Sequence, residues 1–128
     1  MAQLAGLARA WKLWEGDYDF AVDGGAVSTI TLRSSHGPIP SGAIIFGGVL
    51  DISSSLLSGT GTAALNSEGA GDLLAAVGQA GLTAGRKSLI PVFTGASSVK
   101  TTAARNPAIT IATAGFTAGA FKLSLWYL

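Results

Sequence analysis

The sequence predicts an all-β protein: a single antiparallel β-sandwich or jelly-roll-like domain with one short helix and an N-terminal arm. Three observations predict this class. Apolar residues recur with period two over most of the chain, turns rich in glycine and proline separate these segments, and seven or eight such segments occur in 128 residues. A chain of this length is expected to form one domain with one core.

The first strand pair is expected around a double glycine. The segment YDFAVD (18–23) alternates apolar and polar residues, and AVSTITLRS (26–34) continues the alternation after Gly24 and Gly25. Glycine adopts the positive φ angles that a two-residue connection demands. The sequence therefore predicts a β-hairpin over residues 18–34.

The middle of the chain continues the β pattern. The segment AIIFGGVLDISSS (43–55) is predicted to form a strand or a pair of strands, with a bulge at Gly47 and Gly48. The segment TAALN (62–66) follows the turn SGTGT and is predicted to form the next strand.

One helix is expected inside the domain, over EGAGDLLAAVGQA (68–80). Asp72 stands near its start, where negative charge suits the helix dipole, and Gly78 is expected to end it. Its apolar face would consist of Leu73, Leu74 and Val77.

The last third of the chain is again predicted to be β. The segment SLIPVF (88–93) is expected at a sheet edge because Pro91 donates no ladder hydrogen bond. Strands are also expected at SVKTT (98–102), AITIATA (108–114) and FKLSLWYL (121–128). In the last of these, Trp126 and Leu128 fall on the face opposite Phe121, Leu123, Leu125 and Tyr127.

Residues 1–16 do not follow this pattern, so we divide the chain into an arm (1–16) and a sandwich (17–128). Leu4, Leu7, Trp11 and Trp14 lie at helical spacing, with Arg9 and Lys12 off that stripe, although an extended arm is equally compatible with the sequence. The two tryptophans either close one end of their own sandwich, dock on a neighbouring subunit, or belong to a helix on a membrane surface.

Composition narrows the function classes. Charged residues make up 12% of the chain against 48% hydrophobic residues, and the net charge is +1. A nucleic-acid-binding domain usually has a strongly basic stripe, and the longest apolar stretch is too short and too interrupted to span a membrane. The chain has no cysteine, which removes disulfides and thiolate metal ligands. A surface with so few charges is suited to permanent association with partners.

The search for catalytic chemistry identifies no active site. GLTAGRKS (81–88) resembles a phosphate-binding loop, but Arg86 replaces the second glycine and Pro91 interrupts any following helix. His36 lies in a turn-rich loop, and no serine has the glycines of a nucleophile elbow. The acidic residues near the start are expected on a solvated strand face: Glu15, Asp17, Asp19 and Asp23. We therefore expect no enzyme, no cofactor, no metal and no small-molecule substrate.

Three stretches carry a resemblance to a known family. They are YDFAVDGGAVSTITLRSSHGPIPSGAII, GAGDLLAAVGQA and SVKTTAARNPAITIATAGFTAGAFKLSLWYL, and together they cover nearly all of the chain after Asp17. This order of turn and strand motifs resembles the head decoration, or cement, proteins of tailed bacteriophages and related small virion proteins. None of the motifs is catalytic.

The resemblance implies a β-sandwich on the outer surface of a phage head, made in the bacterial cytoplasm. It implies homotrimers that bind the major capsid protein and clamp its subunits together. On this basis Leu7, Arg9, Trp11 and Trp14 are expected to contact the capsid or a neighbouring subunit, and Trp126 and Leu128 to contact another copy. Two alternatives remain open, a β-module of the phage tail or baseplate and a carbohydrate-binding sandwich.

Overall fold

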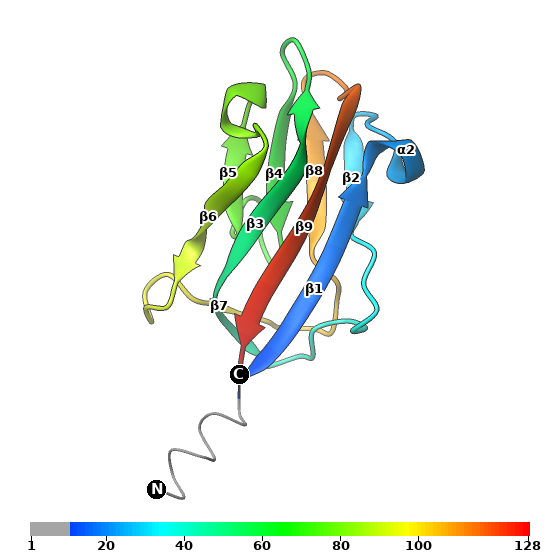
Figure 1. Cartoon of the computed structure of the whole chain (residues 1–128). Coiled ribbons are helices and arrows are strands. Elements are labelled where there is room, and N and C mark those ends of the chain that lie inside the picture. The colour runs from blue at the N-terminus through cyan, green and yellow to red at the C-terminus, as the bar shows by residue number, and fades with distance from the viewer. Residues whose placement is uncertain (1–10) are drawn as a thin grey trace, which may run out of the picture.

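Residues 11–128 of the computed structural model form a sandwich of two antiparallel sheets (Figure 1). The first sheet contains β1 (Lys12–Asp19), β9 (Ala118–Tyr127), β3 (Ile44–Leu57) and β6 (Gly85–Val92) in this order, and β7 (Val99–Lys100) also pairs with β3. The second sheet has the order β2 (Ser28–Thr31), β8 (Ala108–Ala112), β4 (Thr62–Asn66) and β5 (Leu74–Val77). The predicted fold class is confirmed.

The core lies between the two sheets and follows the period-two pattern. On β9, Phe121, Leu123 and Leu125 point inward and are buried, while the residues between them point outward. Ile109 and Ile111 of β8 face them from the second sheet. Sheet-on-sheet packing of this kind buries the inner residues of both layers and leaves two outer faces for other contacts.

The predicted strands of the middle and last thirds are found, and β4 spans the residues expected for TAALN. The irregularity expected at Gly47 and Gly48 is present, because the registers of β3 with β6 and with β9 both shift there. The strand that contains Pro91, β6, lies at the edge of its sheet as predicted. The sandwich begins at Lys12, so the boundary expected at residue 16 falls inside β1.

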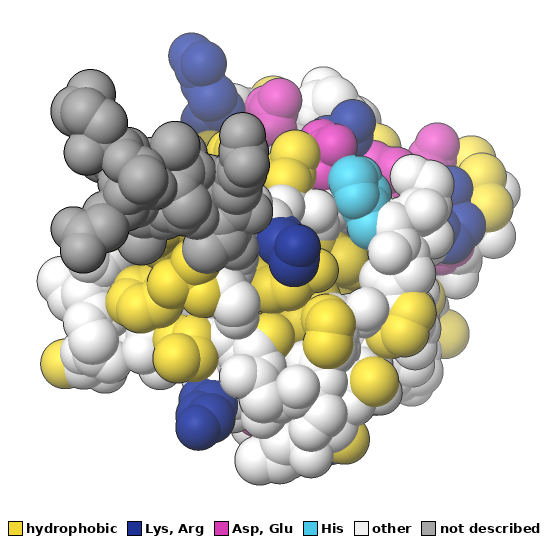
Figure 2. All heavy atoms as spheres, turned by 90° about the horizontal axis from the view of Figure 1, so that it is seen from below, with side chains coloured by type: hydrophobic (Ala, Val, Ile, Leu, Met, Phe, Trp, Pro, Cys, Tyr) yellow, Lys and Arg dark blue, Asp and Glu magenta, His cyan; other side chains and the backbone are white. Residues whose placement is uncertain are grey.

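The two ends of the described chain lie side by side at one end of the sandwich. Lys12 is opposite Tyr127 in the β1–β9 ladder, and Leu128 exchanges two backbone hydrogen bonds with Ile44 on β3, each 3.0 Å long. Figure 2 looks onto this end and shows hydrophobic side chains gathered over much of it, with basic side chains standing singly among them.

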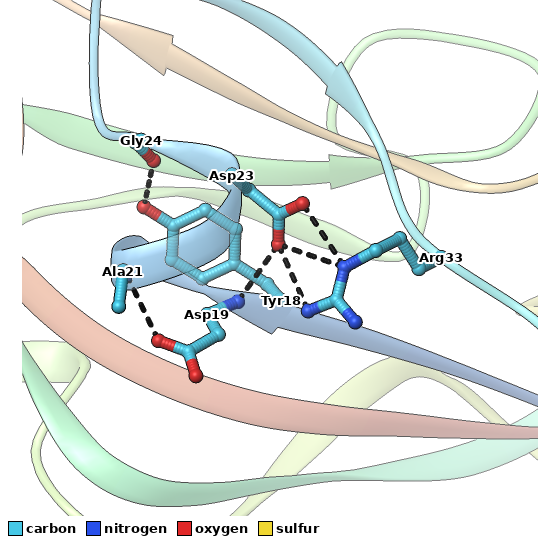
Figure 3. A network of polar contacts seen from close by, with 6 residues as sticks. All are labelled: Tyr18, Asp19, Ala21, Asp23, Gly24 and Arg33. Carbon is cyan, nitrogen blue, oxygen red and sulfur yellow. Dashed lines mark hydrogen bonds and ion pairs between the residues drawn. The ribbon is translucent and has the colours of Figure 1, made fainter.

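The expected hairpin at residues 18–34 is wrong, because β1 and β2 belong to different sheets. β1 ends at Asp19, whose carboxylate accepts a hydrogen bond from the Ala21 N–H (3.0 Å) and thereby caps a single helical turn, α2 (Phe20–Asp23). Figure 3 shows the network around this turn, in which the Tyr18 hydroxyl donates to the Gly24 carbonyl (2.5 Å). The chain thus crosses from one sheet to the other.

Asp23 at the end of α2 binds the side chain of Arg33, which follows β2 of the second sheet. Its carboxylate accepts hydrogen bonds from Nε (3.0 Å) and Nη2 (3.1 Å) of Arg33 and from the Asp19 N–H (2.9 Å). Asp17 of β1 and Arg33 also exchange two backbone hydrogen bonds, at 2.8 and 3.2 Å. This closes one side of the sandwich.

The helix expected over residues 68–80 is also wrong. Leu74–Val77 form β5, and only one 3-10 turn, η1 (Gln79–Gly81), follows. Asp72 does not start a helix: its carboxylate accepts hydrogen bonds from the N–H groups of Ser67, Glu68 and Gly69 at 2.7 to 2.9 Å. These bonds fold the connection between β4 and β5 into a tight turn, so that the residues after Asp72 continue as the strand β5 and not as a helix.

Candidate interaction surface

Two of the polar residues singled out from the sequence, His36 and Glu15, belong to a small group of ion pairs on the surface. His36 Nε2 is 3.5 Å from one oxygen of Glu15, and Lys122 Nζ is 3.6 Å from the other. In the part of the chain that the structure describes, no three His, Cys, Asp or Glu side chains are grouped so as to hold a metal ion. The segment 81–88 resembled a phosphate-binding loop, and its second half, Gly85–Ser88, is part of β6, where the backbone pairs with β3.

The outer face of the first sheet carries the features that suit binding to another protein. The pairing of β1, β9, β3 and β6 places their residues side by side in rows across the sheet. Two of these rows have a marked chemical character, one apolar and one charged. The apolar row lies near the end of the sheet where β1 begins and consists of Leu13, Trp126, Gly47 and Val92. Four residues further along β1, β9 and β3, and six residues along β6, lies the charged row, which consists of Asp17, Lys122, Asp51 and Arg86.

An aromatic cluster extends the apolar row. The Trp11 ring meets Phe46 edge to face, with centroids 5.4 Å apart, and lies 6.1 Å from the Phe93 ring. Phe93 is 57% exposed and Trp126 is 41% exposed. We call Trp11, Phe46, Phe93 and Trp126 the aromatic band. Large exposed apolar side chains grouped in this way mark surfaces that bind other proteins.

The backbone at Phe93 is strained. Its φ is 63°, in the left-handed region that a bulky residue rarely adopts, and its N–H donates to the Phe46 carbonyl at 2.6 Å. The ring lies over Gly47, where any side chain would collide with it. The glycine and the strained residue together keep an exposed aromatic ring against the sheet, an arrangement typical of functional surfaces rather than of stable cores.

The charged row alternates in sign across the sheet. Asp17 on β1 is opposite Lys122 on β9, Lys122 is opposite Asp51 on β3, and Asp51 is opposite Arg86 on β6. All four side chains are exposed. Arg33 lies beyond Asp17, but its guanidinium is held by Asp23.

The outer face of the second sheet is of a different kind. Its outward residues on β4 and β8 are small or uncharged: Thr62, Ala64, Asn66, Ala108, Thr110 and Ala112. Thr110 receives a hydrogen bond from the Asn66 amide (2.5 Å) and lies 3.0 Å from the Thr29 hydroxyl. The described strands of this face carry no aromatic ring on their outer side, and Thr113, directly after β8, has a positive φ of 71°.

The residues predicted to contact partners differ in their exposure in the structure. Trp14 is only 1% exposed and belongs to the core, so its expected contact with a neighbour is corrected: β1 turns this side chain inward, as one of the three alternatives proposed. Trp11 lies on the outer surface in the aromatic band. Trp126 and Leu128 are exposed, at 41% and 36%. Leu7 and Arg9 lie outside the described residues.

Sequence reasoning did not identify Phe46, Phe93 or the charged row. Phe46 follows two isoleucines in a continuous apolar run, where no alternation indicates which residues face outward. The charged row depends on register between strands that are far apart in the sequence. The only available signal was Pro91, which marked the neighbourhood of Phe93 as an edge.

Comparison with known proteins gives similarity at the level of structure. No protein-family model and no curated protein matches the chain. A chain from the structure described as the cyanophage Pam1 capsid asymmetric unit aligns with a TM-score of 0.61 and 22% identity, over 91% of this chain and 83% of that one. A chain from the acidic stable capsid structure of Helicobacter pylori bacteriophage KHP30 aligns with a TM-score of 0.59 and 12% identity, over 92% and 86%.

The likeness establishes a shared fold. At these identities the sandwich, and not the conservation of particular residues, is what the three chains have in common. The alignments cover most of the two capsid chains, so the whole sandwich is similar rather than a fragment of a larger fold. None of the helices formed by residues 11–128 has the length and apolar character needed to cross a membrane.

Proposed function

We propose that this chain is a non-enzymatic structural protein of a bacteriophage virion, and specifically a decoration or cement protein on the outer surface of the head. The observation that carries the proposal is the likeness of nine tenths of the chain to chains of two phage capsid structures. The sequence motifs point to the same class. The low charge and the exposed aromatic band are the properties expected of a subunit that is permanently bound to partners.

Such a protein acts through binding and not through chemistry. If it binds the assembled shell of major capsid protein and not the free subunits, each occupied site stabilises the shell by the free energy of binding. At a concentration one hundred times the dissociation constant this amounts to about 2.7 kcal/mol for each site. Summed over the sites of a head, this resists internal pressure.

The proposed contacts lie at the end where β1 begins. We assign Leu7, Arg9 and Trp11 to the contact with the major capsid protein. Trp11 directly precedes β1 and belongs to the aromatic band, which is the exposed surface nearest to this segment of the chain. We assign Trp126 and Leu128 to contacts between copies of the chain. A homotrimer is the assembly that the resemblance to decoration proteins implies.

Immunogold electron microscopy of virions tests the location. Antibodies against the purified protein should label the outer surface of the head. Label confined to the tail would replace the decoration role by a tail or baseplate module. Absence of label on the virion, together with binding on a glycan array, would favour the carbohydrate-binding alternative.

Deletion of residues 1–10 tests the role of the arm. Because β1 begins at Lys12, this deletion spares the sandwich, whereas deletion to residue 16 would remove the buried Trp14. We expect the shortened protein to unfold at the same temperature as the full chain and to bind purified heads at least tenfold more weakly, a loss of about 1.4 kcal/mol. Thr60→Glu, an exposed change in the turn between β3 and β4 at the opposite end of the sandwich, is the control that should bind normally. Full binding by the shortened protein would remove the arm from the contact.

A further inference from the structure

The charged row has a symmetry that bears on how copies of this chain contact each other. It runs across four strands with the signs minus, plus, minus, plus, in the order Asp17, Lys122, Asp51, Arg86. A row with an even number of alternating charges becomes its own complement when it is reversed. A second copy that faces the first with its strands in reversed order would therefore place an opposite charge against every charge.

Only one kind of two-fold axis reverses the row. An axis in the plane of the interface, parallel to the strands and between β9 and β3, sets β1 against β6 of the second copy and β9 against its β3. Asp17 then faces Arg86, and Lys122 faces Asp51, twice each in the pair. An axis perpendicular to the strands and through the row would set each residue against its own copy and oppose like charges. The sign pattern thus selects the first arrangement.

The same axis brings the apolar rows together. Leu13 comes opposite Val92, and Trp126 comes opposite Gly47 and the Phe93 ring that covers it. Exposed apolar surface is thereby removed from water, which supplies most of the affinity, while the charges fix the orientation. Two aligned sheets pack face to face in this manner within single domains.

The flanking charges do not oppose this arrangement. Arg33 would extend the row beyond Asp17, but it has no opposite residue because β6 is the edge strand, and Asp23 binds its guanidinium. Glu15 is 3.6 Å from Lys122 and comes opposite Ser88, which is uncharged.

We infer that the outer face of the first sheet is a two-fold interface between two copies of this chain, aligned by the alternating charged row. The inference deepens the contact between copies in the proposed function and assigns Trp126 to it. A trimer would have to be built through another surface. The inference does not require binding to a head, so the two proposals fail separately.

Charge reversal with rescue tests the pairing. In the dimer, residue 51 of each copy faces residue 122 of the other copy. Asp51→Lys therefore places two lysines opposite each other at both of these positions, and Lys122→Glu places two carboxylates there. We expect the unmodified protein to be a dimer by light scattering after size exclusion, and each single variant to dissociate about tenfold more readily or more. Because exposed charge pairs contribute little to folding, both variants should keep a normal unfolding midpoint.

Rescue is the decisive measurement. In an equimolar mixture of the two variants every facing pair is again opposite in charge, and the same holds for the double variant Asp51→Lys with Lys122→Glu. Both samples should return to the dimer. Thr60→Glu, which adds a carboxylate at the exposed turn between β3 and β4, outside the face, should stay dimeric throughout.

Three results would overturn the pairing. They are a monomer at about 200 μM of the unmodified protein, a trimer or other oligomer that is indifferent to the single reversals, and single variants that dissociate without rescue in the mixture. A dimer that behaves as expected but does not bind heads would leave the pairing intact and overturn the decoration role. These outcomes separate the two proposals.

Discussion

The indole Nε1 of Trp14 donates a hydrogen bond to the carbonyl oxygen of Gly37, 2.9 Å away. Trp14 is on β1, and Gly37 is in the loop that connects β2 to β3. This bond therefore ties the loop to the edge of the first sheet. The indole ring covers Gly16 on the same strand, where any side chain would overlap it. The residue that the sequence placed in an arm therefore fixes one side of the core.

Trp14→Ala is expected to destabilise the fold by about 3–5 kcal/mol, because it removes a fully buried ring and leaves a cavity. Trp14→Phe keeps most of the buried area and loses the hydrogen bond, so it should cost about 1–3 kcal/mol. Urea unfolding followed by circular dichroism measures both. Equal stability of Trp14→Ala and the unmodified protein would show that the indole is not part of the core.

Thr101 is expected to contribute through hydrogen bonds and not through volume. Its hydroxyl donates to the Pro40 carbonyl (2.6 Å) and accepts from the Ala43 N–H (2.9 Å), and the residue is 2% exposed. Thr101→Val has nearly the same shape, leaves both groups without this partner and should cost about 1–3 kcal/mol. Thr60→Val, at an exposed turn position, is the matched control and should change the midpoint of thermal unfolding very little.

Neighbouring glycines on β3 are expected to respond differently to alanine. At Gly47 an added methyl group meets the exposed Phe93 ring, which is able to swing away, so Gly47→Ala should cost less than about 1 kcal/mol. At Gly48 the methyl group meets the backbone carbonyl of Ser124 on β9, which cannot move alone, so Gly48→Ala should cost about 2 kcal/mol or more. Chemical denaturation of both variants decides the order, and the reverse order would contradict this account.

The Asp23 carboxylate is expected to make stability depend on acid pH. Partial burial by itself would raise the pKa of Asp23, but hydrogen bonds from the Arg33 side chain and the Asp19 N–H, with the charge of Arg33, outweigh it and lower the pKa below its ordinary value of 3.8. A folded-state pKa below the unfolded one stabilises the fold above the unfolded value, and this contribution is lost as the pH falls through the folded value.

Comparison of Asp23→Asn with the unmodified protein isolates this contribution. The difference between their unfolding midpoints should be constant above about pH 5 and should shrink as the pH falls below 3.8, the ordinary value. A difference that grows toward low pH would have the wrong sign for this ion pair.

The sequence predicted the sheets better than the connections. β4, β8 and β9 were found because alternation along a half-buried strand is a local property that each segment carries by itself. The hairpin at residues 18–34 failed because Asp19 caps a helical turn before the double glycine, and a capping side chain is ambiguous in sequence. The helix at residues 68–80 failed because Asp72 binds backbone N–H groups that precede it.

The surface was predicted least well. Trp126 and Leu128 were assigned to the outer face from their alternation on the last strand, and they lie there. The charged row could not be predicted, since Asp17, Lys122, Asp51 and Arg86 become neighbours only when four strands pair in a non-sequential order. Trp14 was misplaced because a tryptophan near the start of a strand has the same local pattern as one in an arm.

The position of the C-terminal residue Leu128 has a practical consequence for labelling and display. A fluorescent protein or affinity tag fused after Leu128 would sit beside the aromatic band, because Leu128 is hydrogen-bonded to Ile44, two residues before Phe46, and it would mask the contacts proposed here. The turn between β3 and β4 and the turn between β8 and β9 lie at the far end of the strands. Foreign epitopes inserted at exposed Gly59 and Thr60 would therefore leave the aromatic band free, and this turn is the position of choice for carrying cargo.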